Sequence, residues 1–304
     1  MPRRLIMRVV LGVAGVLGLG GVAWAFSQGW IGPQGRARHL FAVAQQAMRR
    51  QEWPAAQAAL EQLVGAFPDS PWTDDGLLVL GQAYEQQQHL VEARAAYRLL
   101  PERFPDSALT QDAQARLGAV NVALQFSPTV TETDAVYEVR SGDTLAEIAG
   151  AHHTTIELMK RANGLSGDVI RPKQKLKVPG GSFAIVVDKS QNQLLLTEQN
   201  QFFKAYAVAT GANNSTPVGT FKIINKITHP IWYRQGAVVP PESPENILGT
   251  RWMGWDKPGF GIHGSIDPTA MGHQVTAGCV RMTNPEVEEL FALVPVGTEV
   301  TVVD

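Results

Sequence analysis

The sequence predicts a multidomain chain: an N-terminal membrane helix, an all-α repeat region, a small α+β unit and a mainly β C-terminal domain. Three observations support this prediction. An uncharged run of eighteen residues lies near the start, a helical pattern then repeats, and β-type runs fill the last third. At 304 residues the chain is long enough for two or three cores. Its net charge of −2 gives no electrostatic case for binding nucleic acid.

The first segment, residues 1–27, is expected to be a signal anchor or a signal peptide. Three early arginines precede the uncharged run Val9–Phe26. As a helix this run would span about 27 Å at ~1.5 Å per residue, close to the ~30 Å hydrocarbon core. The arginines should stay in the cytoplasm, so we expect a single-pass anchor in the inner membrane, with the rest of the chain in the cell envelope. Ala23-Trp-Ala25 fits a cleavage site, but the length of the run favours a retained anchor.

Residues 36–126 are predicted to form helical repeats. The run from Gln51 to Ser70 aligns with the run from Gln88 to Ser107, a shift of 37 residues. Such a period is typical of stacked helix pairs. The segment resembles the tetratricopeptide-like repeats of envelope proteins. It therefore serves either as a surface for an envelope protein partner or as a spacer, and the sequence does not choose between them.

A polar linker, 127–135, precedes a compact unit at 136–179. Its expected elements run strand, helix, helix, strand: Val136–Arg140, Leu145 to about Ala151, Thr155 to about Ala162 and Lys175–Val178. Two capping boxes are predicted to start the helices, Thr144 with Glu147 and Thr154 with Glu157.

The motifs of this unit are Tyr137–Leu145, Asn163-Gly-Leu165 and Ile170–Pro179, and together they resemble a LysM domain over its whole length. The resemblance implies that the unit binds glycans containing N-acetylglucosamine. The implied groove lies between the first turn and the loop before the last strand. The residues expected to line it are Gly142, Asp143, Thr144, Leu145 and Ile170.

A mainly β domain is predicted at 183–304, after a short glycine-containing hinge. Its first β-rich runs are Phe183–Asp188, Gln193–Thr197, Phe202–Ala209 and Thr220–Ile227. Residues 228–261 hold several aromatic side chains with little periodicity. This composition favours a substrate-covering loop over a satellite packing cluster.

Cys279 is the only cysteine, so it cannot form an intramolecular disulfide and serves either packing or reactivity. Gly278 lets the backbone approach a ligand, and the amides of Gly278 and Cys279 are candidates for an oxyanion hole. A nucleophilic thiol needs a nearby base or cation, and His263 and Arg281 are the nearest candidates in the sequence. One imidazole close to the thiol is expected to generate a useful thiolate at neutral pH.

The motifs Gly261-Ile-His-Gly-Ser265, Thr276-Ala-Gly-Cys-Val-Arg-Met282 and Pro295-Val-Gly-Thr298 resemble the catalytic core of YkuD-type L,D-transpeptidases of bacterial cell walls. The resemblance covers roughly residues 183–303. It implies that Cys279 is the nucleophile and His263 the general base, with the Gly264 carbonyl orienting the imidazole. It also implies that Arg281 lies near the substrate, and Thr276 and Ser265 are further candidates for substrate contact.

The chain departs from this family at Ala277, because the family usually has a histidine directly before the Gly-Cys pair. If His263 is the base, that histidine would be auxiliary, and His273 is a weaker candidate to replace it. Two other interpretations stay open. His263, His273 and Cys279 could ligate zinc, although their spacing matches no compact zinc motif. Alternatively, Cys279 is a small buried residue in a domain that only binds the wall.

The implied function is an acyltransferase that acts on peptidoglycan and requires no metal or other cofactor. Cys279 would attack the carbonyl of the third, L-centred stem-peptide residue, expel the terminal D-alanine, and pass the acyl group to an amine of a second stem. Water as the acceptor would make the protein an L,D-carboxypeptidase, and a catalytically weak form would mainly bind the wall. The sequence does not separate these outcomes, since they depend on how well the site excludes water.

Overall fold

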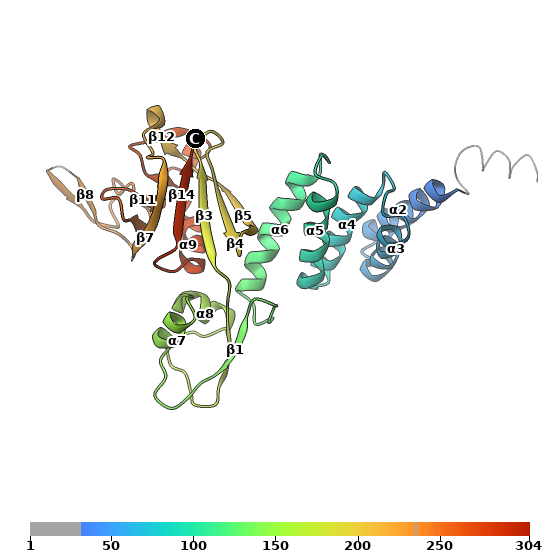
Figure 1. Cartoon of the computed structure of the whole chain (residues 1–304), viewed down its shortest axis with the longest axis horizontal. Coiled ribbons are helices and arrows are strands. Elements are labelled where there is room, and N and C mark those ends of the chain that lie inside the picture. The colour runs from blue at the N-terminus through green and yellow to red at the C-terminus, as the bar shows by residue number, and fades with distance from the viewer. Residues whose placement is uncertain (1–31, 235) are drawn as a thin grey trace, which may run out of the picture. The chain divides into compact units, whose positions relative to one another are not determined.

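The computed structural model describes residues 32–234 and 236–304. The predicted membrane segment, 1–27, lies outside these residues. Within the described ranges, every helix is too short or too polar to cross a membrane. The chain forms two compact units, and the division falls after Arg116, within helix α6 (Figure 1).

The first unit consists of helices, of which the first four pack in sequence order (Figure 1). They are α2 (Pro33–Arg49), α3 (Trp53–Ala66), α4 (Thr73–Gln86), α5 (Leu90–Arg103) and the start of α6 (Thr110–Gln125). The predicted repeat is confirmed at the level of single hydrogen bonds. The Thr73 hydroxyl donates to the Phe67 carbonyl, and the Thr110 hydroxyl donates to the Phe104 carbonyl, 37 residues later. Each bond closes the turn between one helix pair and the next.

The unit at 136–179 has the predicted βααβ order. Its elements are β1 (Ala135–Glu138), α7 (Leu145–Ala151), α8 (Ile156–Ala162) and β2 (Lys175–Val178), and β1 pairs with β2 in antiparallel fashion. Thr144 and Glu147 form the predicted capping box of α7. The second predicted box is wrong. Thr155, rather than Thr154, caps α8 by accepting from the Leu158 amide, and Glu157 pairs with Arg161 one turn along the helix.

The polar segment 127–135 is held in place around one buried lysine. The ammonium group of Lys177 donates to the carbonyls of Leu124, Ser127 and Thr129 and lies 3.3 Å from the Asp134 carboxylate. A linker was expected here because the segment is polar. The sequence did not reveal that backbone carbonyl groups in and before this segment surround the ammonium group of Lys177, a residue of β2.

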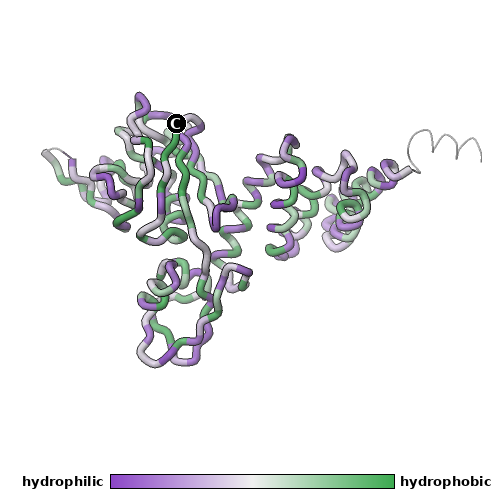
Figure 2. Tube along the Cα trace, viewed as in Figure 1, coloured by the Kyte–Doolittle hydropathy of each residue, from purple (hydrophilic) through white to green (hydrophobic). Residues whose placement is uncertain are grey.

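The C-terminal part is built on an eight-stranded sheet with the order β13-β11-β10-β7-β14-β3-β4-β5 (Figure 1). The strands are β3 (Phe183–Asp188), β4 (Gln193–Glu198), β5 (Gln201–Ala207), β7 (Gly219–Thr228), β10 (Arg251–Trp255), β11 (Gly261–His263), β13 (Val280–Arg281) and β14 (Glu299–Val303). Helix α9 (Asn284–Leu293) contributes buried side chains to the same core. Hydrophobic residues are concentrated along these strands (Figure 2).

Two short strand pairs flank the sheet: β6 (Thr210–Gly211) with β12 (Gln274–Thr276), and β8 (Trp232–Arg234) with β9 (Ala237–Val239). Residues 228–261 were therefore only partly a loop, since they include the β8–β9 hairpin and strand β10 inside the large sheet. Trp255 on β10 is 2% exposed and stacks on Phe221. The sequence did not indicate strand β10, because glycine and aromatic residues interrupt the alternation of apolar and polar residues that is typical of a strand.

Candidate active site

His263 ends strand β11, which lies between β10 and β13 in the sheet. Its side chain is 2% exposed, and Nδ1 lies 2.7 Å from the Gly264 carbonyl oxygen. A carbonyl oxygen can only accept, so this bond places the ring proton on Nδ1. Nε2 of the neutral imidazole is therefore left as a proton acceptor.

The backbone after His263 is tied to the loop before β10 by a residue that the sequence did not indicate. The side-chain oxygen of Asn284, at the start of α9, accepts from the amides of Thr250 and Ser265, both at 3.1 Å. It thereby joins the strand-end loops before β10 and after β11. No sequence signal indicated this role, because the two amides lie 34 and 19 residues before Asn284 in the chain.

Ser265 lies away from the position expected of a substrate contact. Its hydroxyl donates to the Asp267 carbonyl at 2.8 Å and accepts from the Asp267 amide at 2.9 Å. The side chain is 6% exposed and does not line the pocket described below. Ser265 therefore shapes the loop after β11.

Cys279 directly precedes β13 in a loop that is fixed by Thr276. The Thr276 hydroxyl donates to the Cys279 carbonyl at 2.6 Å and accepts from the Gly278 amide at 3.2 Å. Gly278 has a φ of +130°, and a Cβ there would lie 2.8 Å from the Phe260 ring, so only glycine fits. The Gly278 amide, expected to face an oxyanion, instead donates to Thr276.

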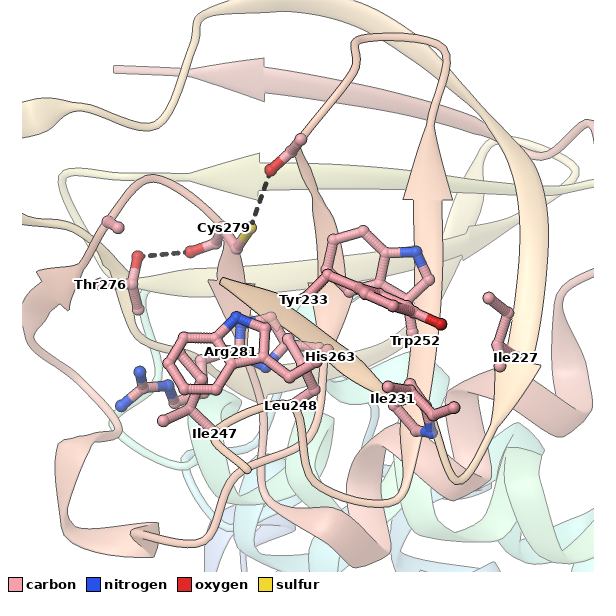
Figure 3. Close-up of a pocket in the computed structure, with 14 residues that line it drawn as sticks. Ile227, Ile231, Tyr233, Ile247, Leu248, Trp252, His263, Thr276, Cys279 and Arg281 are labelled. Atoms are coloured by element: carbon pink, nitrogen blue, oxygen red, sulfur yellow. Dashed lines mark hydrogen bonds between the residues drawn. The ribbon is translucent and has the colours of Figure 1, made fainter. Parts of the chain in front are cut away.

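Cys279 and His263 line one pocket of about 440 Å³ (Figure 3). Strands β11 and β13 are parallel neighbours with His263 opposite Arg281, which brings the two segments together. Arg281 also faces the pocket. The rest of the lining is mainly apolar and comes from the predicted aromatic segment and its flanks: Ile227, Ile231, Trp232, Tyr233, Leu248 and Trp252.

Burial shifts the pKa values of His263 and Cys279 toward the neutral form of each side chain. Burial lowers the pKa of His263 to about 4, and the Arg281 charge adds to this effect. Burial raises the pKa of the Cys279 thiol, and this outweighs a backbone hydrogen bond from Gly261 and the Arg281 charge. The thiol donates to the Gly259 carbonyl at 3.5 Å (Figure 3). Both shifts disfavour the thiolate expected at neutral pH.

Arg281 lines the pocket and contains a buried donor without a partner in the described part of the chain. Its Nε is buried and has no hydrogen-bond partner among the residues that the structure describes. A buried donor without a partner costs free energy.

The two other candidate positions near the cysteine differ in their relation to the pocket. Ala277 is exposed at the edge of the pocket, and His273 is exposed outside its lining. Across the described ranges, no three His, Cys, Asp or Glu side chains gather as a metal site would require. The zinc set His263, His273 and Cys279 is therefore not assembled.

The comparisons with known proteins agree with this geometry. Residues 182–302 match the family model of the L,D-transpeptidase catalytic domain, YkuD. The YkuD protein of Bacillus licheniformis is 32% identical over 175 residues, which are 55% of this chain and 98% of that protein. The chain belongs to the YkuD family of L,D-transpeptidases. As a member of this family it is a cell-wall L,D-transpeptidase.

Other matches cover parts of this transpeptidase. The YqjB protein of Bacillus subtilis is 36% identical over 141 residues, 44% of this chain and 78% of that protein. An L,D-transpeptidase structure from Mycobacterium smegmatis aligns with a TM-score of 0.34 and 19% identity, and covers 43% of this chain and 64% of that one. Residues 137–179 match the LysM domain model, and residues 75–107 match a tetratricopeptide repeat.

In the LysM domain of the transpeptidase, several predicted glycan-binding side chains serve the turn itself. The Asp143 carboxylate accepts from the Arg140 amide and the Tyr137 hydroxyl, and these bonds lower its pKa. Thr144 caps α7, and Leu145 is 2% exposed in the domain core. Ile170 also packs against that core. Gly142 and Thr144 are exposed at this turn, whereas Leu145 is buried.

Proposed function

We propose that Cys279 is the nucleophile of the transpeptidation and that His263 is its general base. One observation carries this proposal: the single thiol and an imidazole whose proton is fixed on Nδ1 line the same pocket. Nε2 is thereby left free to take the thiol proton.

In the first half of the reaction, Sγ attacks the carbonyl carbon of the third stem residue while Nε2 of His263 takes the thiol proton. The tetrahedral intermediate collapses, and the imidazolium returns that proton to the leaving amine of the terminal D-alanine. A thioester to Cys279 remains. In the second half, the amine of another stem attacks the thioester, His263 accepts its proton, and the thiol is restored with that proton.

The resting neutral pair fits this sequence of steps. Charge develops on the imidazole only as the thiol attacks. Interactions with that charge therefore stabilise the transition state and not the resting enzyme. The Arg281 guanidinium, which lines the pocket, would contact an oxygen of the stem peptide. The apolar wall disfavours water in the pocket, which supports an amine acceptor, and hence transpeptidation, over L,D-carboxypeptidase activity.

The remaining parts of the chain fit the same role. The LysM and transpeptidase domains support a cell-envelope location with peptidoglycan as the partner. The uncharged N-terminal run would anchor the chain in the membrane, and the helical repeats would bind an envelope protein or act as a spacer.

The test is to incubate the chain with purified sacculi and to analyse the released muropeptides by mass spectrometry. We expect new crosslinked dimers that are missing with Cys279→Ala. Tripeptides without dimers would indicate a carboxypeptidase. Sacculi that bind the protein but remain unchanged would indicate a wall-binding protein.

A further inference from the structure

Trp252 on β10 is the residue directly opposite His263 on β11. The flanking ladder bonds run from the Gly264 amide to the Arg251 carbonyl and from the Trp255 amide to the Phe260 carbonyl. Because hydrogen-bonded and non-hydrogen-bonded pairs alternate, Trp252 and His263 form a non-hydrogen-bonded pair, in which side chains lie closest. Their ring centroids are 6.0 Å apart and the planes differ by 21°, so the rings stack (Figure 3).

Two glycines in the sheet leave the space that the indole of Trp252 occupies. The next pair on the same face of the two strands is Gly254 opposite Gly261. A Cβ on Gly254 would lie 2.8 Å from Nε1 of Trp252, and a Cβ on Gly261 would lie 3.0 Å from its six-membered ring. Two paired glycines therefore leave a flat surface on which the indole lies. Its orientation over the imidazole is determined by the strands and does not require a substrate.

We infer that Trp252 is a positioning residue for the base: its ring holds the His263 imidazole in place and faces the charge that the imidazole takes up. This inference rests on the proposed role of His263. The Gly264 carbonyl holds the imidazole at one edge only, and the indole face restrains the ring's remaining rotation. An aromatic face also attracts a cation, with tryptophan the most effective ring, so it favours the imidazolium formed as the thiol is deprotonated.

The alternative is that Trp252 is only part of the apolar wall that contacts substrate. Trp232 provides a matched control, because it lines the same pocket but contacts Arg234 rather than His263. Loss of a wall residue weakens substrate binding, whereas loss of a residue acting on the base slows the chemical step.

The experiment measures kcat and KM for Trp252→Leu, Trp252→Phe and Trp232→Leu in the full chain, using a soluble disaccharide-tetrapeptide. We expect Trp252→Leu to lower kcat about tenfold with KM within about threefold, and Trp252→Phe to lower kcat only about threefold. Trp232→Leu should mainly raise KM. Thermal denaturation reports folding. If the leucine variant does not fold, Trp252→Phe alone should still lower kcat by about threefold without changing KM.

A change in KM alone at Trp252, or equal kcat for the wild type and both Trp252 variants, would overturn the inference. His263→Ala, measured in parallel, separates the two proposals. If it retains turnover, the proposed base is wrong. If it is inactive while Trp252→Leu keeps full kcat, only the role of Trp252 fails.

Discussion

The two reactive side chains are held in opposite ways. His263 sits within the sheet, almost completely buried, with its ring fixed by Gly264 and stacked on Trp252. Cys279 lies on a glycine-containing loop, is partly exposed, and points its thiol at the Gly259 carbonyl. The proposed base is therefore preorganised by long-range strand pairing, while the proposed nucleophile depends on a few local hydrogen bonds. Substitutions around His263 and substitutions around Cys279 should therefore lower activity for different physical reasons.

Replacing the base should have the largest effect. We expect His263→Ala to lower kcat about a thousandfold, because general acid–base catalysis typically contributes 10²–10⁴-fold. The acyl-transfer rate is measured with a soluble donor and acceptor, and thermal denaturation checks that the protein remains folded. Turnover within tenfold of the wild type would show that the thiol is activated by another group.

The pH dependence of thiol alkylation tests whether the resting pair is neutral. Only the thiolate reacts, and burial raises the thiol pKa above its ordinary value, so the thiolate fraction stays small at pH 7 and grows as pH rises. We expect the rate of Cys279 alkylation by iodoacetamide to increase about tenfold per pH unit from pH 7 to 9 and to be still rising at pH 9. A plateau below pH 8 would instead indicate a preformed thiolate with imidazolium.

The hydrogen bonds of the cysteine loop can be removed without touching the thiol. Thr276→Val deletes the hydroxyl that binds the Cys279 carbonyl and the Gly278 amide. We expect about tenfold lower kcat and a loss of roughly 1–3 kcal/mol in stability, because these groups lose their partner. Thr276→Ser keeps the hydroxyl and should stay within about threefold of the wild type. Equal activity of the valine and serine variants would mean that the loop is fixed by other contacts.

The family's missing histidine should matter least. We expect Ala277→His to gain less than about tenfold in kcat, because the base is already provided by the sheet. His273→Ala should stay within about tenfold of the wild type, since its side chain is exposed and outside the pocket. A hundredfold gain in kcat for Ala277→His, together with almost no loss of kcat for His263→Ala, would indicate that the general base acts from position 277.

The sequence predicted best what depends on neighbouring residues. Helix α7 matches its predicted bounds because Thr144 and Glu147 form a local capping box, and β3 matches because its β-rich run is unbroken. The motifs around Cys279 and His263 also placed both residues at one pocket. Prediction failed where partners lie far apart in the chain.

Three residues illustrate that limit. Asn284 joins two loops that precede it by 34 and 19 residues, and no local pattern marks it. Trp252 faces His263 only through the register of β10 with β11. Leu158 of the LysM domain is buried in the core of the transpeptidase domain, a contact that sequence spacing does not reveal. Burial also lowers the pKa of His263 and raises the pKa of Cys279. Both shifts disfavour the thiolate that the reference pKa values predict.

The central claim is that Cys279 carries the acyl group during turnover, and intact-protein mass spectrometry tests it most directly. The wild type and Cys279→Ala are mixed with a disaccharide-tetrapeptide and quenched in acid within seconds. We predict a wild-type adduct equal to the substrate minus D-alanine, which peptide mapping locates to Cys279, and no adduct on the alanine variant. Turnover by Cys279→Ala, or an adduct on another residue of the wild type, would contradict this mechanism.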